Sequence, residues 1–153
     1  MKKFVLVALA ASVFQLAQAG DIGYDHKADP FQQLNLATRQ AQDEKKLVLV
    51  ISGGDWCKWC HILSDYLKKD AALMARLKEV FVISKIYIGP KNPNQQFFSQ
   101  LPQLPGVPGF WVLSATGEVL AAKNTGELES GDSYSRKLFL EFIGKWEKHL
   151  NRG

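Results

Sequence analysis

Apolar residues recur along this chain in two ways, at helical spacing and in short continuous runs. The stretch after Asp29-Pro30 has the helical pattern, and Asp followed by Pro is a favourable helix N-terminus. Lys45 and Lys46 follow, where cations favour a helix C-terminus. We therefore predict a helix between these two signals, with one apolar face made of Phe31, Leu34, Ala37 and Ala41.

The next apolar run, LVLVI at residues 47–51, is short and rich in β-branched residues, which predicts a strand buried on both faces. Gly53 and Gly54 end it. The remaining pattern predicts a helix that runs on or restarts near Asp70, a strand at 80–88, a short helix at 95–101, a hairpin of strands 110–113 and 118–122, and a helix at 135–150. Early alternation predicts a parallel crossover, and the hairpin adds an antiparallel strand. The expected fold class is α/β, a small mixed sheet with helices on both faces.

The first residues have the features of an export signal. Lys2 and Lys3 precede an apolar run that ends in Ala17-Gln18-Ala19, a small-x-small cleavage pattern. The run is shorter than the roughly 20 apolar residues of a spanning helix, which disfavours an uncleaved anchor. We expect a cleaved signal peptide at 1–19, a loose lead-in segment at 20–29 and one domain at 30–153, exported to the bacterial periplasm.

Composition and charge narrow the function classes. The net charge of the 153 residues is +4, and Lys2 and Lys3 leave with the signal, so the excess is too small to predict nucleic-acid binding. Two cysteines, Cys57 and Cys60, are few for a secreted domain held together by disulfides. A loop this short constrains the unfolded chain weakly, so chemistry explains the pair better than stapling.

The C-x-x-C segment follows a strand and a Gly-Gly turn, at the start of a helix. Free N–H groups and the positive end of the helix dipole lower the pKa of a thiol there, and Lys58 adds a cation. We expect Cys57 to be partly thiolate and to attack substrate disulfides. Cys60 is one helical turn further on the same face, so the two sulfurs can form a disulfide, and Cys60 resolves the mixed disulfide.

The strand LVLVI, the lead-in GGDWC and the CKWC site together resemble the active-site segment of the thioredoxin-like superfamily. A second match is GVPGFWVLSATGEVL at residues 106–120. The resemblance implies a cis-proline at Pro108, preceded by Val107, that faces the dithiol. Gly117 matches the hairpin glycine of the family, and Gly126 the glycine that precedes its last helix. The resemblance covers roughly residues 30–150 and implies a thioredoxin-like fold.

The chain departs from the family pattern in several places. Family thioredoxins often carry a buried carboxylate where this chain has Ile51, so a proton at Cys60 must move through another group or water. Lys85 is placed like a family lysine near that relay. The dipeptide between the cysteines is Lys58-Trp59 instead of Gly-Pro, which implies a cousin of thioredoxin rather than a thioredoxin. The usual first strand is absent or displaced by the lead-in.

Several residues are expected to bind substrate. We expect Trp56 to form an apolar rim, and Trp59, between the thiols, to be exposed for partner contact together with Lys58. The resemblance places Val107 and Pro108 opposite the sulfurs, where the backbone of Val107 could pair with an extended substrate strand. Ordinary packing is the alternative for both tryptophans.

Other readings of the motif remain open. C-K-W-C-H is also the pattern of c-type haem attachment with His61 as iron ligand, although the candidates for a distal ligand have no supporting context: Met74, His26 and His149. Zinc needs a second ligand pair, which the sequence lacks. His61 is expected at the edge of the site rather than as a base. A further alternative is a thioredoxin-fold binding module, chaperone or adaptor whose dithiol is incidental.

We therefore expect a monomeric, periplasmic thiol–disulfide oxidoreductase that acts on thiols and disulfides of exported proteins. It needs no metal or organic cofactor, because Cys57 and Cys60 carry the two electrons. The chain has no room for the helical insert of family oxidases and no dimerisation domain like that of isomerases. Both features favour a reductase supplied with electrons by a membrane partner.

Overall fold

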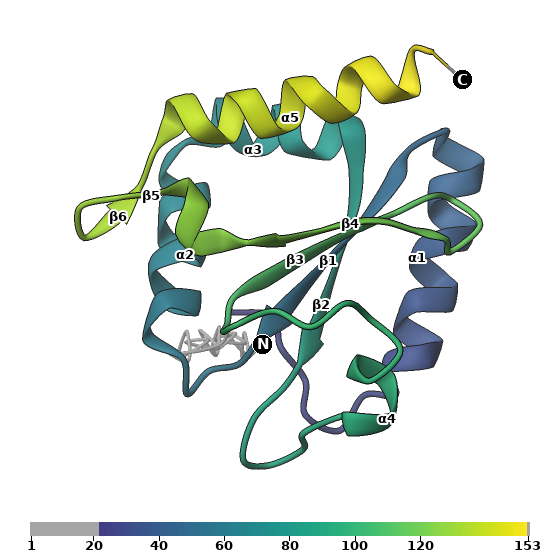
Figure 1. Ribbon diagram of the computed structural model, residues 1–153, viewed down its shortest axis with the longest axis vertical. Helices are drawn as coiled ribbons and strands as arrows, with labels where there is room; N and C mark the ends of the chain where they lie inside the picture. Colours follow the sequence, from purple (N-terminus) through teal and green to yellow (C-terminus); the bar gives the residue numbers. More distant parts are fainter. Residues whose placement is uncertain (1–21, 153) are drawn as a thin grey trace, which may run out of the picture.

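A computed structural model describes residues 22–152 as a mixed sheet between two layers of helices (Figure 1). The signal peptide predicted at 1–19 lies outside the described residues. The helices are α1 (Pro30–Glu44), α2 (Lys58–Lys69), α3 (Ala71–Val80), α4 (Gln95–Phe98) and α5 (Arg136–Leu150), with a 3-10 turn η1 (Thr125–Leu128). The strands are β1 (Leu47–Gly53), β2 (Phe81–Tyr87), β3 (Gly109–Leu113), β4 (Val119–Asn124), β5 (Glu129–Ser130) and β6 (Ser133–Tyr134). The predicted fold class, a small mixed α/β sheet, is confirmed.

The main sheet has the strand order β2-β1-β3-β4. β1 and β2 are parallel and are joined by the α2–α3 crossover, with Leu47 paired to Phe81 and Ile51 to Lys85. β3 runs antiparallel to β1, and β4 is antiparallel to β3. The carboxyl ends of β1 and β2 therefore lie at the same edge of the sheet, where the C-x-x-C segment begins.

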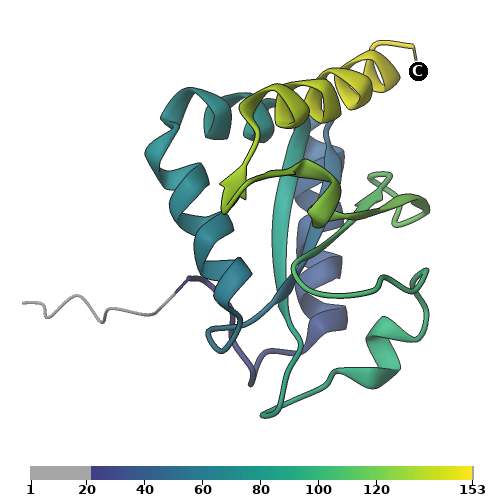
Figure 2. The same cartoon turned by 60° about the vertical axis from the view of Figure 1, so that its left-hand side comes forward.

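Alternate residues of β1 point into two separate hydrophobic clusters. Leu47, Leu49 and Ile51 pack with α2, α3 and α5, whereas Val48 and Val50 pack with α1 and α4. Figure 2 shows α2, α3 and α5 on one side of the sheet and α1 on the other. Because both faces are covered, every residue of β1 is buried, as the continuous apolar run predicts.

Most element boundaries agree with the pattern of the sequence. The second helix does restart at Asp70, whose side chain caps α3 by accepting a hydrogen bond from the N–H of Leu73 at 2.9 Å. The turn between β3 and β4 uses Gly117 at φ 89°, a conformation that favours glycine. Within residues 22–152, no helix has the length and apolarity needed to cross a bilayer.

The pattern failed to predict the hairpin of β5 and β6. This hairpin stands between η1 and α5, so Gly126 lies inside η1 and does not directly precede the last helix as the resemblance implied. Each of its strands has two residues, which is too short for any hydrophobic period. Among the described residues no strand precedes α1, and the lead-in segment occupies that part of the chain.

Candidate functional site

The site is built where β1 gives way to α2. Cys57 caps α2, and its sulfur accepts a hydrogen bond from the backbone N–H of Cys60 at 3.1 Å. The two cysteines form a disulfide with a Cα–Cα distance of 5.2 Å. Both are buried, with exposed fractions of 5% for Cys57 and 2% for Cys60. The sulfurs therefore lie at the N-terminus of a twelve-residue helix, where the dipole and N–H groups favour a negative charge.

The loop before β3 brings Val107 and Pro108 against the disulfide. The carbonyl oxygen of Val107 is 3.9 Å from the sulfur of Cys57, and the Val107–Pro108 peptide bond is cis. The hydroxyl of Thr125 donates a hydrogen bond to the carbonyl of Pro108 at 2.6 Å. The hydroxyl oxygen of Ser52 accepts one from the N–H of Gly109 at 3.0 Å. These two hydrogen bonds fix the loop to η1 on one side and to β1 on the other.

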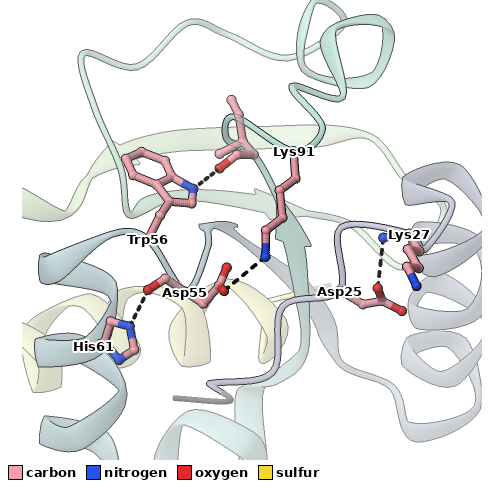
Figure 3. A network of polar contacts seen from close by, with 7 residues as sticks. Asp25, Lys27, Asp55, Trp56, His61 and Lys91 are labelled. Atoms are coloured by element: carbon pink, nitrogen blue, oxygen red, sulfur yellow. Dashed lines mark hydrogen bonds and ion pairs between the residues drawn. The ribbon is translucent and has the colours of Figure 1, made fainter. Parts of the chain in front are cut away.

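Trp56, which directly precedes Cys57 in the sequence, forms an exposed aromatic surface, and Figure 3 shows its indole directed at a backbone carbonyl. Half of this residue is accessible to solvent, and its indole N–H donates to the carbonyl of Ile88 at 2.8 Å. The ring lies against the backbone at Gly54 and Gly89, since a Cβ added at either glycine would collide with it. Glycine at both positions thus lets a large side chain lie flat over the chain while its outer face stays in solvent.

The expected exposure of Trp59 is wrong. This side chain is half-buried and packs edge-on against Tyr134 of β6, with ring centroids 5.7 Å apart. Tyr134 is itself buried, and burial raises its pKa to about 12. Because β6 was not predicted, the sequence offered no partner that could cover Trp59.

Polar contacts join residues on both sides of the motif in sequence. The Nε2 atom of His61 donates a hydrogen bond to the carbonyl of Asp55 at 2.7 Å, since a carbonyl can only accept (Figure 3). The carboxylate of Asp55 is 3.6 Å from the ammonium of Lys91, and both side chains are about half exposed. Lys58 is exposed in the first turn of α2. His61 is thus oriented by backbone at the edge of the site.

The lead-in segment, expected to be loose, contributes two residues that sequence reasoning missed. Ile22 is buried in one cluster with Cys57 and Cys60, and Tyr24 packs against the same cluster. The ammonium of Lys85 donates to the carbonyl of Ile22 at 2.6 Å and lies 5.5 Å from the centre of the Tyr24 ring. The alternation of Ile22 and Tyr24 with polar neighbours was the available signal, but it is too short to count as a pattern.

The chemistry available here is exchange between a dithiol and a disulfide. Within residues 22–152, no group of three or more His, Cys, Asp or Glu side chains could hold a metal ion. The sulfur at the helix N-terminus, the neighbouring second sulfur and the adjacent backbone of Val107 suffice for two-electron exchange with another disulfide. Such a fold and site define a thiol–disulfide oxidoreductase.

The comparison with known families gives the same class. The sequence profile of a family described as thioredoxin-like matches residues 29–115, which is more than half of the chain. This chain therefore belongs to the thioredoxin-like family.

A solved structure shows the same fold, and two others are similar to a smaller degree. A disulphide isomerase from Xylella fastidiosa Temecula1 is similar with a TM-score of 0.67 and 27% identity, over 82% of this chain and 96% of that one. A redox protein from Chlamydomonas reinhardtii has a TM-score of 0.43 and 22% identity, over 72% of this chain and 31% of that one. A thioredoxin-fold protein from Helicobacter pylori has a TM-score of 0.43 and 15% identity, over 70% of this chain and 85% of that one. No match was found among curated protein sequences.

Proposed function

We propose that this protein attacks disulfides of exported proteins from its dithiol state, as a reductase rather than an oxidase. The observation that carries the proposal is the position of the Cys57 sulfur. This sulfur accepts a hydrogen bond from the backbone N–H of Cys60 at the start of α2 and faces the carbonyl of Val107. A nucleophilic sulfur beside a backbone edge suits a substrate disulfide in an extended segment. The likeness to a disulphide isomerase supports this direction, since isomerisation begins when a reduced cysteine attacks a substrate disulfide.

The two cysteines take different parts. The Cys57 thiolate attacks one sulfur of the substrate disulfide, forms a mixed disulfide and releases the other substrate sulfur as a thiolate. Cys60 then attacks the sulfur of Cys57, which restores the Cys57–Cys60 disulfide and releases the second substrate thiolate. Two electrons pass from protein to substrate, and the protons lost by the protein balance those gained by the substrate thiols.

Substrate recognition uses the surfaces on either side of Cys57. The backbone of Val107, held by the tethered loop at Pro108, pairs with the extended substrate chain, and the exposed indole of Trp56 contacts its apolar side chains. Lys58 adds a positive charge at the rim. Trp59 does not contact the substrate but stabilises the start of α2, because its ring packs against Tyr134.

Export to the periplasm is part of the proposal. Lys2 and Lys3, the apolar run and the Ala17-Gln18-Ala19 pattern support cleavage before Gly20, and the reduced state is maintained by a membrane electron donor. The working unit is a monomer. N-terminal sequencing of protein recovered from the periplasmic fraction should begin at Gly20, and an intact Met1 would contradict export by cleavage.

Insulin reduction tests the activity. With dithiothreitol as electron source, the full chain should accelerate insulin precipitation, and Cys57→Ser should remove the acceleration. A protein that neither accelerates precipitation nor shows a reversible dithiol in glutathione buffers would instead be a binding module with an incidental disulfide.

A further inference from the structure

The resolving sulfur is covered by the lead-in segment and not only by the core of the domain. Ile22, with an exposed fraction of 6%, shares a cluster with both cysteines, and Tyr24 packs on that cluster. The ammonium of Lys85 ties this segment to β2 through the carbonyl of Ile22. The phenol of Tyr24 is thus brought to the sulfurs by a contact between the start of the chain and the sheet.

The hydroxyl of Tyr24 and the sulfur of Cys60 border the same space. A Cβ added to Gly53 would lie 2.6 Å from the Cys60 sulfur and 2.8 Å from the Tyr24 hydroxyl oxygen. Both atoms therefore border the space beside the Cα of Gly53, which a side chain at that position would fill. In the disulfide form the Tyr24 hydroxyl donates to the carbonyl of Ser52 at 3.4 Å, a long hydrogen bond that is weak.

The groups around this phenol keep it protonated. Burial raises the pKa of Tyr24 above its ordinary value, and nearby Tyr134 raises it further. The ammonium of Lys85 also faces the ring, 5.5 Å from its centre. Ile51 lies in the core and pairs with Lys85 across the sheet, so β1 places no ionisable side chain at that position. A neutral phenol can donate a hydrogen bond here but cannot act as a general base.

We propose that the Tyr24 hydroxyl donates a hydrogen bond to the Cys60 sulfur when the disulfide is open, and so stabilises the thiolate that resolves the mixed disulfide. When the Tyr24 hydroxyl turns away from the carbonyl of Ser52, it loses only a weak hydrogen bond. A hydrogen bond to a charged sulfur is stronger than one between neutral groups. The effect of this hydrogen bond on turnover rests on the proposed function, whereas its effect on the Cys60 thiol does not.

The proton and electron balance is simple. The Cys60 thiol loses its proton to water, and its thiolate attacks the sulfur of Cys57 in the mixed disulfide. The bond between Cys57 and the substrate sulfur breaks, and the substrate leaves as a thiolate that takes a proton from water. Tyr24 keeps its own proton throughout and only donates its hydrogen bond.

The direct test measures Cys60 in a chain where it is the sole cysteine. In the Cys57→Ser background, the rate of alkylation of Cys60 is followed against pH with and without Tyr24→Phe, which removes only the hydroxyl. We expect Tyr24→Phe to raise the pKa of the Cys60 thiol by about one unit. Tyr66→Phe is the matched control, because this half-buried phenol packs on Tyr134 and Phe139. An unchanged profile in Tyr24→Phe, or an equal change in Tyr66→Phe, overturns the proposal.

A second measurement follows the resolving step itself. A mixed disulfide between Cys57 and a small aromatic thiol should release the thiol about tenfold more slowly in Tyr24→Phe below the pKa of Cys60, and at nearly the wild-type rate well above it. A slowing that is the same at every pH would indicate a packing role and overturn the proposal. Since alkylation needs no protein substrate, the result can be interpreted even if the protein reduces no insulin.

Discussion

The backbone N–H of Cys60 donates a hydrogen bond to the sulfur of Cys57 at 3.1 Å. The environments of the two sulfurs differ, because the sulfur of Cys60 lies near the hydroxyl of Tyr24 in the lead-in segment, and that of Cys57 faces the carbonyl of Val107. A negative charge on Cys57 is therefore stabilised by the start of α2, while Cys60 is covered by the chain.

This asymmetry predicts different behaviour of the two serine variants. Cys60→Ser should accumulate mixed disulfides with exported proteins, because Cys57 can still attack but nothing resolves the product. Cys57→Ser should accumulate few, since its remaining sulfur is covered. Non-reducing gels of acid-quenched cells would measure both, and equal trapping by the two variants would contradict the assignment.

The charge of Lys58 should tune the reduction potential. In glutathione buffers we expect the wild-type potential at about −200 to −250 mV, within or slightly below the glutaredoxin range. Lys58→Glu should raise the pKa of Cys57, destabilise the reduced form and lower the potential, by less than about 30 mV because the side chain is exposed.

Lys69→Glu provides the control for this change. It makes the same charge substitution at the other end of α2, in its last turn, and should leave the potential unchanged. A wild-type value near about −120 mV would indicate an oxidase. Equal potentials for Lys58→Glu and wild type would remove Lys58 from the mechanism.

The two tryptophans of the motif should respond oppositely to truncation. Trp56→Ala should raise KM for a peptide disulfide several-fold with little loss of stability, because the ring is half exposed and Ile88 loses only a hydrogen bond that water can replace. Trp59→Ala should lower the free energy of unfolding by about 1–3 kcal/mol, because it removes the contact with Tyr134. Urea unfolding and steady-state kinetics distinguish the two, and a stability loss confined to Trp56→Ala would refute the assignment.

Stability should fall at alkaline pH. Burial raises the pKa of Tyr134 from its ordinary value of 10.0 to about 12 in the folded protein. The folded state therefore binds this proton more tightly, so its contribution is complete below pH 10 and is lost as the pH rises through about 12. Tyr24, with a pKa also raised by burial, acts in the same direction.

Urea unfolding between about pH 9 and pH 12 measures this loss. Tyr134→Phe should reduce the pH dependence by up to about 2–3 kcal/mol, because phenylalanine has no proton to lose. Tyr66→Phe is a suitable comparison on α2, since burial raises that phenol's pKa too, but Tyr66 is only half-buried and should contribute less. An identical slope in Tyr134→Phe and wild type would show that other groups control alkaline unfolding.

The amino-acid sequence by itself determined the main elements and the reactive pair. The helices from α1 to α5 and the strands of the main sheet follow from periods of apolar residues that are local and several residues long. The C-x-x-C spacing places both sulfurs on one turn of a helix, so their disulfide needs no information from the rest of the chain. These features depend on neighbours in sequence.

Only the tertiary structure decided what surrounds the sulfurs. Ile22 and Tyr24 pack against the two cysteines, and Tyr134 covers Trp59, each across a long separation in sequence. A pattern of apolar positions shows which side chains are buried, but not which distant segment buries them. That choice depends on the summed packing of both sheet faces, and segments as short as the lead-in and the β5–β6 hairpin have too few residues to carry a period of their own.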